Sequence, residues 1–206
     1  MLRQYLQRLV QHSTFMSKAY WFAKYLERDP YAVGMDADGR YLDALSLIPP
    51  DPGLVALELG CGEGQFTDLL AERVSHVFAT DISHSAIRRA RQRLQHRRNV
   101  QFTTSDLSHD ALEQDAYSLV VCMEVLYYIP CDLLDVCVEK VWRSVRENGF
   151  ILLGHRRERP QNRGRFVIPF GAETIHERFR TIPSLLCIRE LDRKTDLISL
   201  IKRCGG

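Results

Sequence analysis

Residues 55–64 read VALELGCGEG, an apolar run that ends in a carboxylate and leads into three glycines at alternate positions. An amphipathic segment follows, with Phe66, Leu69, Leu70 and Val74 at helical spacing. This succession predicts a buried strand, a tight turn and a helix, which together form the first unit of a doubly wound α/β domain. Glycine is needed where the backbone takes a positive φ or approaches a ligand so closely that a Cβ would collide. The loop is therefore predicted to hold a nucleotide-like cofactor.

The spacing and the charge of this loop discriminate between cofactors. A dinucleotide-binding loop has the spacing G-x-G-x-x-G, whereas this chain has G-x-G-x-G with Gln65 at the sixth position. Glu58 precedes the loop and Glu63 lies within it, so two carboxylates would repel a pyrophosphate. They would attract a cofactor that carries an ammonium and a sulfonium, which favours S-adenosylmethionine (SAM) over NAD. The alternative is a glycine-rich turn that binds no ligand.

Length and composition bound the remaining possibilities. The 206 residues suffice for one domain with a substantial core, and the net charge of +2 specifies no partner. The six cysteines are scattered without C-x-x-C pairs, so we expect free thiols and neither disulfides nor a metal site. No apolar run reaches the length of about eighteen residues that a membrane span needs. Residues 1–26 contain no acid and fit either an organelle transit peptide or a basic amphipathic helix; we favour the helix and a cytoplasmic location.

Strands and helices alternate from Leu54 onward. The pattern predicts strands near 54–59, 76–81, 100–104, 117–123 and 149–155, and helices near 64–73, 84–97, 132–146 and 171–180. Such alternation indicates a parallel sheet covered on both faces. Residues 184–191 and 196–201 flank a turn and predict a hairpin. We therefore expect an α/β fold with a Rossmann-like, doubly wound, seven-stranded sheet that is mostly parallel and ends in an antiparallel hairpin.

The first fifty residues are predicted to form a helical lid. Residues 1–47 have mostly helical patterning, which Asp29-Pro30-Tyr31 interrupts, and residues 49–53 read PPDPG, a loop. We place the boundary there, between a cap of residues 1–50 and a SAM-binding domain of residues 51–206. The cap is expected to cover the space beyond the cofactor's sulfur.

Two acids are expected at the carboxyl ends of neighbouring strands. Asp81 ends the second strand, where a carboxylate can accept both ribose hydroxyl protons. Alternatively Asp81 caps the next helix, a role that Ser83 can also fill. Asp106 and Leu107 follow the third strand, where an acid can accept from an adenine amino group and an apolar side chain can pack on the ring. Ser105-Asp106 is also ordinary turn chemistry.

The segment after the fourth strand, residues 123–130, reads MEVLYYIP. Together with residues 57–64, 81–83 and 105–107 it resembles the class I SAM-dependent methyltransferases and, within them, the NodS-type nodulation N-methyltransferases. In that family a Glu-Val-Leu-Tyr-Tyr segment follows the fourth strand, and an Asp-Pro-aromatic motif like residues 29–31 precedes the glycine loop. The resemblance covers roughly residues 29–155.

The resemblance implies a set of cofactor contacts. The methionine part of SAM would lie on Glu58 and the glycine loop, the ribose at Asp81 and the adenine between Asp106 and Leu107. Tyr31 and Arg40 would close over the cofactor, with the guanidinium paired to its carboxylate. NodS-type chains usually carry Trp where this chain has Tyr31. The full set is Tyr31, Arg40, Glu58, Gly60, Cys61, Gly62, Asp81, Ile82, Asp106, Leu107 and Glu124.

Glu124, Tyr128 and His155 are the candidate catalytic residues. Methyl transfer requires the nucleophile to be aligned with the methyl carbon and water to be excluded. An amine acceptor must also be neutral, so a base such as Glu124 or His155 would help. The alternatives are a surface histidine at position 155 and tyrosines at positions 127 and 128 that only pack the loop. Tyr127-Tyr128 stands where metal-dependent small-RNA methyltransferases carry Glu-His, which disfavours a metal site.

Two basic segments could bind anionic partners. Helix 84–97 carries many arginines opposite a stripe of Ile87, Ala90 and Leu94, and such a face can bind nucleic-acid phosphates or simply be solvated. The loop after the fifth strand can bind an anionic group or be solvated, through Arg156, Arg157, Arg159, Arg163 and Arg165. We expect methyl transfer to nitrogen, or next to oxygen, of a small acceptor such as an amino sugar. The alternatives are a nucleic-acid methyltransferase and a non-catalytic SAM-binding protein.

Overall fold

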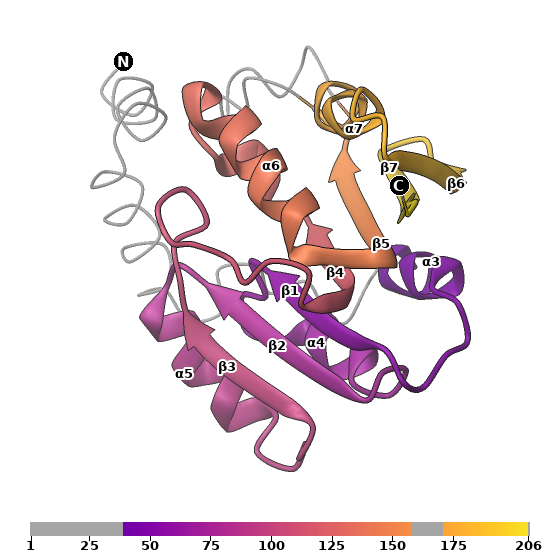
Figure 1. Ribbon diagram of the computed structural model, residues 1–206. Helices are drawn as coiled ribbons and strands as arrows, with labels where there is room; N and C mark the ends of the chain where they lie inside the picture. The colour runs from indigo at the N-terminus through magenta and orange to yellow at the C-terminus, as the bar shows by residue number, and fades with distance from the viewer. Residues whose placement is uncertain (1–38, 158–170, 206) are drawn as a thin grey trace.

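Seven strands form one sheet in the order β3-β2-β1-β4-β5-β7-β6. The computed structural model of the chain describes residues 39–157 and 171–205 (Figure 1). The strands are β1 (Val55–Leu59), β2 (His76–Asp81), β3 (Val100–Thr104), β4 (Tyr117–Met123), β5 (Val145–Arg156), β6 (Leu185–Asp192) and β7 (Asp196–Arg203). The first five strands pair in parallel, and β7 is antiparallel to both of its neighbours, β5 and β6.

Helices cover both faces of the sheet, as the sequence predicted (Figure 1). They are α3 (Arg40–Leu47), α4 (Gln65–Leu70), α5 (His84–Arg93), α6 (Leu134–Ser144) and α7 (Ala172–Arg180), with short 3-10 turns η1 (Leu126–Tyr128) and η2 (Cys131–Leu133). Apolar residues of α3, α4 and α5 share one core cluster with Leu119 and Val121 of β4. Residues of α6 and α7 share the other cluster with Val120 and Cys122. Successive residues of β4 thus face opposite layers, so this central strand is buried on both sides.

The predicted strands and the closing hairpin are confirmed, and the differences lie at the ends of two helices and at the start of β5. Helix α5 ends at Arg93 and not near residue 97, because the backbone leaves helical geometry at Leu94. Helix α4 ends at Leu70, followed by a turn. Strand β5 starts at Val145, four residues before the predicted position, and the irregularity in its pairing with β4 lies between Tyr117 and Leu119.

The predicted lid falls partly outside the described residues. Residues 1–38, including Tyr31, lie outside them. Residues of α3 do not stand apart from the sheet: Ala44, Leu45 and Leu47 are buried in the same core cluster as Ala56 of β1. No helix in the described parts of the chain is long and apolar enough to cross a membrane.

The sheet order reverses direction between β1 and β4. In a doubly wound sheet, ligands bind outside the carboxyl ends of the strands at such a switch point. The segments that leave β1 and β4 there are the glycine loop and the stretch that begins at Glu124. The fold therefore brings together the two most informative motifs of the sequence.

Candidate active site

The glycine loop folds back onto the end of β2. Gly60, Gly62 and Gly64 have φ angles of 74°, 54° and 79°, the left-handed region that favours glycine. The amides of Gly60 and Cys61 both donate to the carbonyl of Thr80, at 2.8 and 2.9 Å. A Cβ on Gly60 would lie 2.5 Å from a methyl carbon of Val125, so a side chain cannot be added without movement. The loop thus packs tightly against the segment that follows β4.

Asp81 ties this loop to helix α5. Its carboxylate accepts hydrogen bonds from the amide of Gly62 at 2.9 Å and from the amide of Ser83 at 2.8 Å. Burial raises the pKa of Asp81 to about 6, against the lowering effect of these two hydrogen bonds. The hydroxyl of Ser83 accepts from the amide of Ala86 and caps α5. Ser83 therefore fills the capping role, and the Asp81 carboxylate lies beside the glycine loop.

Glu58 is a buried carboxyl group beneath the loop. Burial raises the pKa of Glu58 to about 7, against a lowering effect of the Thr67 hydroxyl, and the charge of Asp81 adds to the rise. Its Oε2 atom has no hydrogen-bond partner in the described parts of the chain. Burying such an oxygen is costly unless something else bonds to it. A cationic ligand group over the loop would provide that compensation.

The negative charge of Glu63 is largely neutralised by arginines of α5, which the sequence did not indicate. It forms an ion pair with Arg89 of α5 at 2.8 Å, and Arg93 lies 3.9 Å away. Its negative charge is therefore compensated within the protein. Glu58 and Asp81 are the acids beside the loop that would attract a cationic cofactor.

Asp106 and Leu107 lie at the carboxyl end of β3, and both are buried. The Asp106 carboxylate accepts from the amide of Ser108 at 3.1 Å and also from its hydroxyl. The carbonyl of Leu107 accepts from the ammonium of Lys140 at 2.9 Å. Asp106 therefore stabilises the turn after β3 through its own side chain, which was one of the two roles predicted for it. The turn holds the carboxylate at the strand end where adenine was expected.

Glu124 follows β4 with a φ of 56°, a conformation that is uncommon for a residue other than glycine. Its amide donates to the carbonyl of Gly154 at 2.7 Å. The Oε2 atom accepts from the hydroxyl of Tyr127 at 2.5 Å, while the Oε1 atom is buried and has no hydrogen-bond partner among the described residues. Burial raises the pKa of Glu124, against the effect of Arg40. Backbone strain of this kind clusters at functional sites.

Arg40 reaches Glu124 from helix α3. Its guanidinium lies 3.3 Å from Oε2 of Glu124 and 3.5 Å from Oδ1 of Asp196. In this structure Arg40 thus contacts two carboxylates of the protein, where the resemblance implied the carboxylate of the cofactor. Arg156 lies 3.6 Å from the same oxygen of Glu124, and 54% of its side chain is exposed.

Asp196 was missed by the sequence analysis. It starts β7, pairs in register with Arg156 of β5 and is fully buried. A signal was available, because an antiparallel strand begins at the edge where its parallel neighbours end. The predicted hairpin therefore places the first residue of its second strand beside the carboxyl ends of β4 and β5.

His155 is fully buried, so the interpretation as a surface histidine is wrong. Its Nε2 atom accepts from the amide of Leu126 at 3.4 Å, and its Nδ1 atom lies 3.3 Å from Nε2 of His176. Burial, and the neighbouring His176, lower the pKa of His155 well below its usual range. Both ring nitrogens are engaged inside the fold. This geometry does not suit a general base in contact with an acceptor.

The two tyrosines differ in their surroundings. Tyr127 is buried, with its ring 4.5 Å from that of Tyr128 and 5.6 Å from that of His155. Tyr127 therefore packs the loop and holds Glu124. Tyr128 is half-buried and packs with Ile82 and Ala86 at the start of α5.

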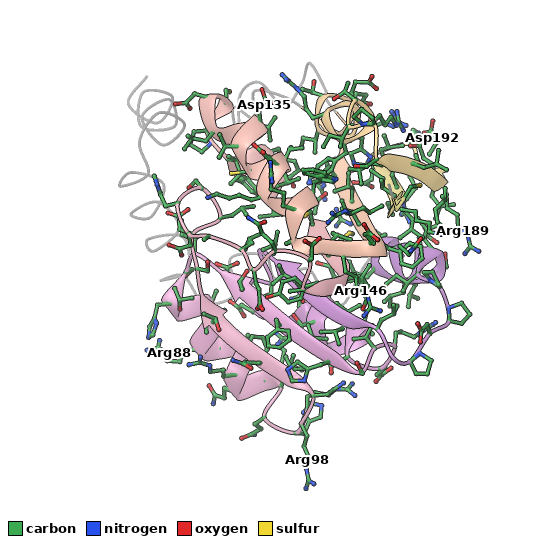
Figure 2. The ribbon with its side chains drawn as sticks, in the orientation of Figure 1. Arg88, Arg98, Asp135, Arg146, Arg189 and Asp192 are labelled. Carbon is green, nitrogen blue, oxygen red and sulfur yellow. The ribbon has the colours of Figure 1, made fainter. Side chains whose placement is uncertain are left out.

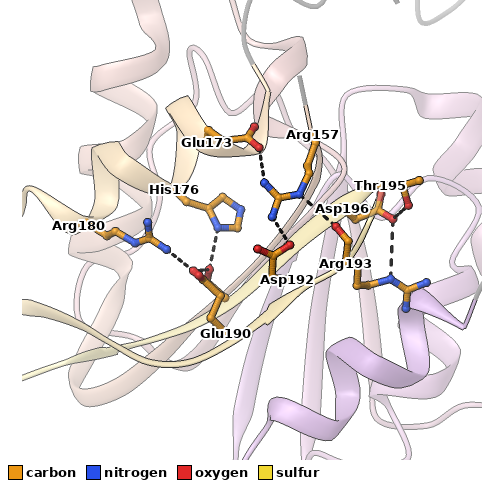
Figure 3. Close-up of polar contacts among 10 residues, drawn as sticks. Arg157, Glu173, His176, Arg180, Glu190, Asp192, Arg193, Thr195 and Asp196 are labelled. Carbon is orange, nitrogen blue, oxygen red and sulfur yellow. Dashed lines mark hydrogen bonds and ion pairs between the residues drawn. The ribbon is translucent and has the colours of Figure 1, made fainter. Parts of the chain in front are cut away.

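Several arginines of α5 and of the turn after it are paired with acids, so fewer of them are free than the sequence suggested. Arg89 and Arg93 face Glu63, and Arg97 pairs with Asp68 at 2.6 Å and with Glu72 at 2.7 Å. Arg88 and Arg98 point outward into solvent (Figure 2). After β5, Arg157 pairs with Glu173 and Asp192 (Figure 3). Arg159, Arg163 and Arg165 lie outside the described residues.

Thiols and metal ligands can be placed for the described residues. Six cysteines are free thiols in this structure: Cys61, Cys122, Cys131, Cys137, Cys187 and Cys204. Cys61 is buried in the glycine loop, and burial raises the pKa of its thiol well above the usual range. No cluster of three or more potential metal-ligating side chains occurs within residues 39–157 and 171–205.

Comparison with known proteins identifies the domain. Residues 56–149 match the sequence family described as a methyltransferase domain. Nodulation protein S of Rhizobium tropici is 31% identical over 122 residues, which are 58% of this chain and 50% of that protein. Phosphoethanolamine N-methyltransferase 1 of Zea mays is 31% identical over 154 residues, which are 71% of this chain and 31% of that protein. The chain thus spans half or less of the length of these relatives.

Solved structures agree on the fold. The N-methyltransferase NodS from Bradyrhizobium japonicum WM9, in complex with S-adenosylhomocysteine, has a TM-score of 0.78 and 21% sequence identity, covering 91% of this chain and 99% of that chain. The Haemonchus contortus phosphoethanolamine N-methyltransferase 1, in complex with phosphoethanolamine and S-adenosylhomocysteine, has a TM-score of 0.75 and 19% identity, covering 92% of this chain and 48% of that chain. From its motifs, its sheet and these relatives, residues 56–149 form a methyltransferase domain that is similar in sequence to nodulation protein S and in fold to the NodS structure solved with S-adenosylhomocysteine.

Proposed function

We propose that the protein transfers a methyl group from SAM to an amine nitrogen of a small molecule. The observation that carries this proposal is the carboxyl group of Glu124. It lies at the switch point of the sheet in a left-handed conformation, and one of its oxygens is buried without a hydrogen-bond partner among the described residues. A carboxylate in that setting suits a group with N–H donors. The similarity to proteins named as N-methyltransferases supports the same acceptor atom.

The residues at the carboxyl ends of β1, β2 and β3 fit the cofactor. We propose that Glu58 and the loop of Gly60, Cys61 and Gly62 hold the methionine part. The unpartnered Oε2 atom of Glu58 is the feature that suits a cationic ligand lying along the backbone. Further along the same edge, Asp81 and Ile82 are proposed to hold the ribose, and Asp106 and Leu107 the adenine.

SAM supplies an electrophilic methyl group on a sulfonium, so the chain itself has to align and deprotonate the acceptor. Glu124 can accept a proton from an ammonium, and burial raises its pKa, which makes it a better base than a solvated glutamate. The hydroxyl of Tyr127 fixes its Oε2 atom, which leaves Oε1 for the amine. Tyr128, half-buried beside Ile82, is proposed to shield the reacting groups from water.

The position of Arg156 favours an acceptor amine that also carries an anionic group. Its exposed guanidinium lies 3.6 Å from Glu124, so a cation stands next to the proposed amine site. An amine that carries an anionic group nearby would pair with both side chains, as a phosphorylated amino alcohol can. An amino sugar would use Glu124 alone. The two acceptor classes therefore differ in their dependence on Arg156.

The experiment uses SAM with a trideuterated methyl group and mass spectrometry of the products. The acceptors are glucosamine, partly deacetylated chitin oligosaccharides and phosphoethanolamine, with N-acetylglucosamine and glycerol phosphate as matched compounds that lack a free amine. We expect label only in amine-bearing acceptors, and Arg156→Gln should impair the phosphorylated acceptor selectively.

Label in the matched compounds would indicate an oxygen acceptor instead. Binding of SAM by calorimetry without transfer to any amine in the panel would contradict the proposal and favour a non-catalytic SAM-binding protein. Transfer to RNA would favour the nucleic-acid alternative.

A further inference from the structure

We propose that a series of hydrogen-bonded side chains, from the buried His155, His176 and Ser199 to Glu190 at the surface, positions the segment that carries Glu124. These residues come from β5, α7, β7 and β6, so the hydrogen-bonded series of side chains connects the strands of the second half of the sheet. Its role in turnover rests on the function proposed above. Its geometry does not, and the two can be tested separately.

The chain consists of successive hydrogen bonds. The amide of Leu126 donates to Nε2 of His155 at 3.4 Å, and Nδ1 of His155 lies 3.3 Å from Nε2 of His176. Nδ1 of His176 lies 2.8 Å from the hydroxyl of Ser199, which donates to Oε2 of Glu190 at 2.8 Å. Arg180 of α7 pairs with the same oxygen of Glu190. Figure 3 shows the outer part of this chain, where His176, Glu190 and Arg180 converge.

Every proton in the chain has an assigned place. A backbone amide can only donate, so Nε2 of His155 must be unprotonated and its Nδ1 must carry the hydrogen. That hydrogen requires an unprotonated Nε2 on His176, whose Nδ1–H then donates to Ser199. Ser199 donates to the carboxylate of Glu190. All donors thus point from Leu126 toward Glu190, which can only accept when ionised.

Burial makes this arrangement specific. His155, His176 and Ser199 are each fully buried. Burial lowers the pKa of His176 to about 3, and the charges of Arg180 and Arg157 add to the effect. A protonated ring would place two donors against each other, at Leu126 or between the histidines. Fully satisfied buried networks of this kind rigidify their surroundings.

The inner end of the chain contacts the reacting segment at two points. Leu126 is the first residue of η1, and the first amides of a helical turn have no acceptor within it, so His155 supplies one. The ring of Tyr127 also lies against that of His155, and the Tyr127 hydroxyl bonds to Glu124. His155 is thus one residue removed from Glu124. We assign it as a positioning residue and not as the base.

The first test measures the tautomers. Long-range proton–nitrogen correlation spectra of the full chain at neutral pH, with 15N-labelled histidine, report which ring nitrogen carries the hydrogen. Signals of His155 and His176 are assigned with His155→Gln and His176→Gln. We expect hydrogen on Nδ1 of both rings. Hydrogen on Nε2 of His155 would overturn the chain whatever the protein's activity.

The second test compares two fully buried serines. Ser199→Ala interrupts the chain, whereas Ser144→Ala removes a hydroxyl that only donates to the carbonyl of Val141 within its own helix. We expect Ser199→Ala to lower kcat for amine methylation by about tenfold, since small displacements of reacting groups are costly. The Kd for S-adenosylhomocysteine should change less than about twofold, and Ser199→Thr should restore part of kcat. Ser144→Ala should leave both quantities unchanged.

Equal kcat values for Ser199→Ala and the wild type would overturn the positioning role. If the wild-type protein methylates no amine, the proposed function fails, and the Leu126 amide resonance decides the positioning role instead. It should shift in Ser199→Ala and stay in place in Ser144→Ala; an unmoved resonance in both would refute the inference.

Discussion

The two halves of the sheet edge hold their acids in different ways. On the side of β1, β2 and β3, Asp81 and Asp106 accept from backbone amides, two of them only two residues along the chain. On the side of β4, β5 and β7, Glu124 and Asp196 are held by side chains, with Arg40 from a distant helix between them. Backbone amides form a preset cradle that suits an invariant ligand such as a cofactor. Side-chain contacts can be exchanged without altering the fold, which suits a binding site for a variable ligand such as a methyl acceptor.

The halves also differ in charge. Glu58 and Asp81 are buried acids whose pKa values are raised to about 7 and about 6. A ligand with an ammonium and a sulfonium would favour their ionised forms. In the second half, Arg40 and Arg156 stand beside Glu124, so the charge there is mixed. Under the proposed function, the first half would bind the cationic cofactor, and the second would take an acceptor with both signs of charge.

The largest effect is expected from adding a side chain to the glycine loop. Gly60→Ala places a Cβ 2.5 Å from Val125 in a left-handed backbone, whereas Gly39→Ala has the same handedness with nothing within 4 Å. The backbone term costs about 1–2 kcal/mol in each variant, and the clash adds about 1–3 kcal/mol in the first only. Urea unfolding should show this difference, and calorimetry should show SAM binding weakened in Gly60→Ala alone. Equal losses in the two variants would mean that the loop does not press against Val125.

The next largest effect is expected from removing the Arg40 guanidinium that lies between Glu124 and Asp196. Arg40→Met leaves Glu124 and Asp196 buried together, and a fully buried pair that loses one partner costs about 3–5 kcal/mol. Because 23% of the Glu124 side chain is exposed, we expect about 2–3 kcal/mol in the free energy of unfolding at pH 7. Asp196→Asn in the Arg40→Met background should recover part of the loss. A loss below 0.5 kcal/mol, on the order of a surface change, would show that this ion pair contributes little.

A smaller effect is the pH dependence of cofactor binding in the first half. Glu58 and Asp81 are increasingly protonated below about pH 7 and about pH 6, and the protonated forms attract a cation less. Affinity for SAM should therefore rise with pH, by about tenfold between roughly pH 5.5 and 7.5, with release of protons on binding. Calorimetry in buffers of different ionisation enthalpy measures both quantities. Affinity that is constant, or that falls with pH, would contradict the assignment of these two acids to the cofactor.

The ligand-free protein should show the opposite trend. Between about pH 4 and about pH 7 the folded state binds more protons than the unfolded state, because the folded pKa values are the higher ones. The contribution of these two carboxyls to the free energy of unfolding therefore falls as pH rises through that window. Both trends have one cause: the two buried carboxyls are costly to ionise in the empty site, and a bound cation stabilises their ionised forms.

The smallest effect concerns the arginine face. Arg88→Glu combined with Arg98→Glu reverses two exposed charges, and the free energy of unfolding should change by less than about 0.5 kcal/mol. Cofactor binding and amine methylation should stay the same, because neither residue is part of the proposed site. RNA binding that depends on salt and disappears in this variant would favour the nucleic-acid alternative.

The comparison also explains what could be predicted from the sequence. The glycine loop, Asp81 and Asp106 follow local rules, because each lies at or just beyond the carboxyl end of a strand that its apolar pattern marks. The parallel order follows from alternating periodicity in the same way. The helix ends at Leu70 and Arg93 were missed because they depend on how the next turn packs.

The second half depends on contacts between distant residues. Arg40 meets Glu124 and Asp196 only because β7 inserts between β5 and β6, which strand patterns alone do not specify. His155 has the same sequence context as a solvated residue, being followed by Arg156 and Arg157. Its burial comes from α7, whose His176 lies among the apolar residues of the buried face. A histidine in that apolar stripe was the one signal available.

The division of labour between the halves is tested most directly by comparing Asp81→Ala with Glu124→Gln. Calorimetry with S-adenosylhomocysteine and turnover of the best amine acceptor are measured on both variants. Asp81→Ala should weaken binding by at least about tenfold, which is 1.4 kcal/mol, whereas Glu124→Gln should bind within about threefold of the wild type and lose at least tenfold in kcat, on the scale of a lost general base. Wild-type affinity in Asp81→Ala, or a Glu124→Gln variant that loses affinity but keeps kcat, would contradict the account.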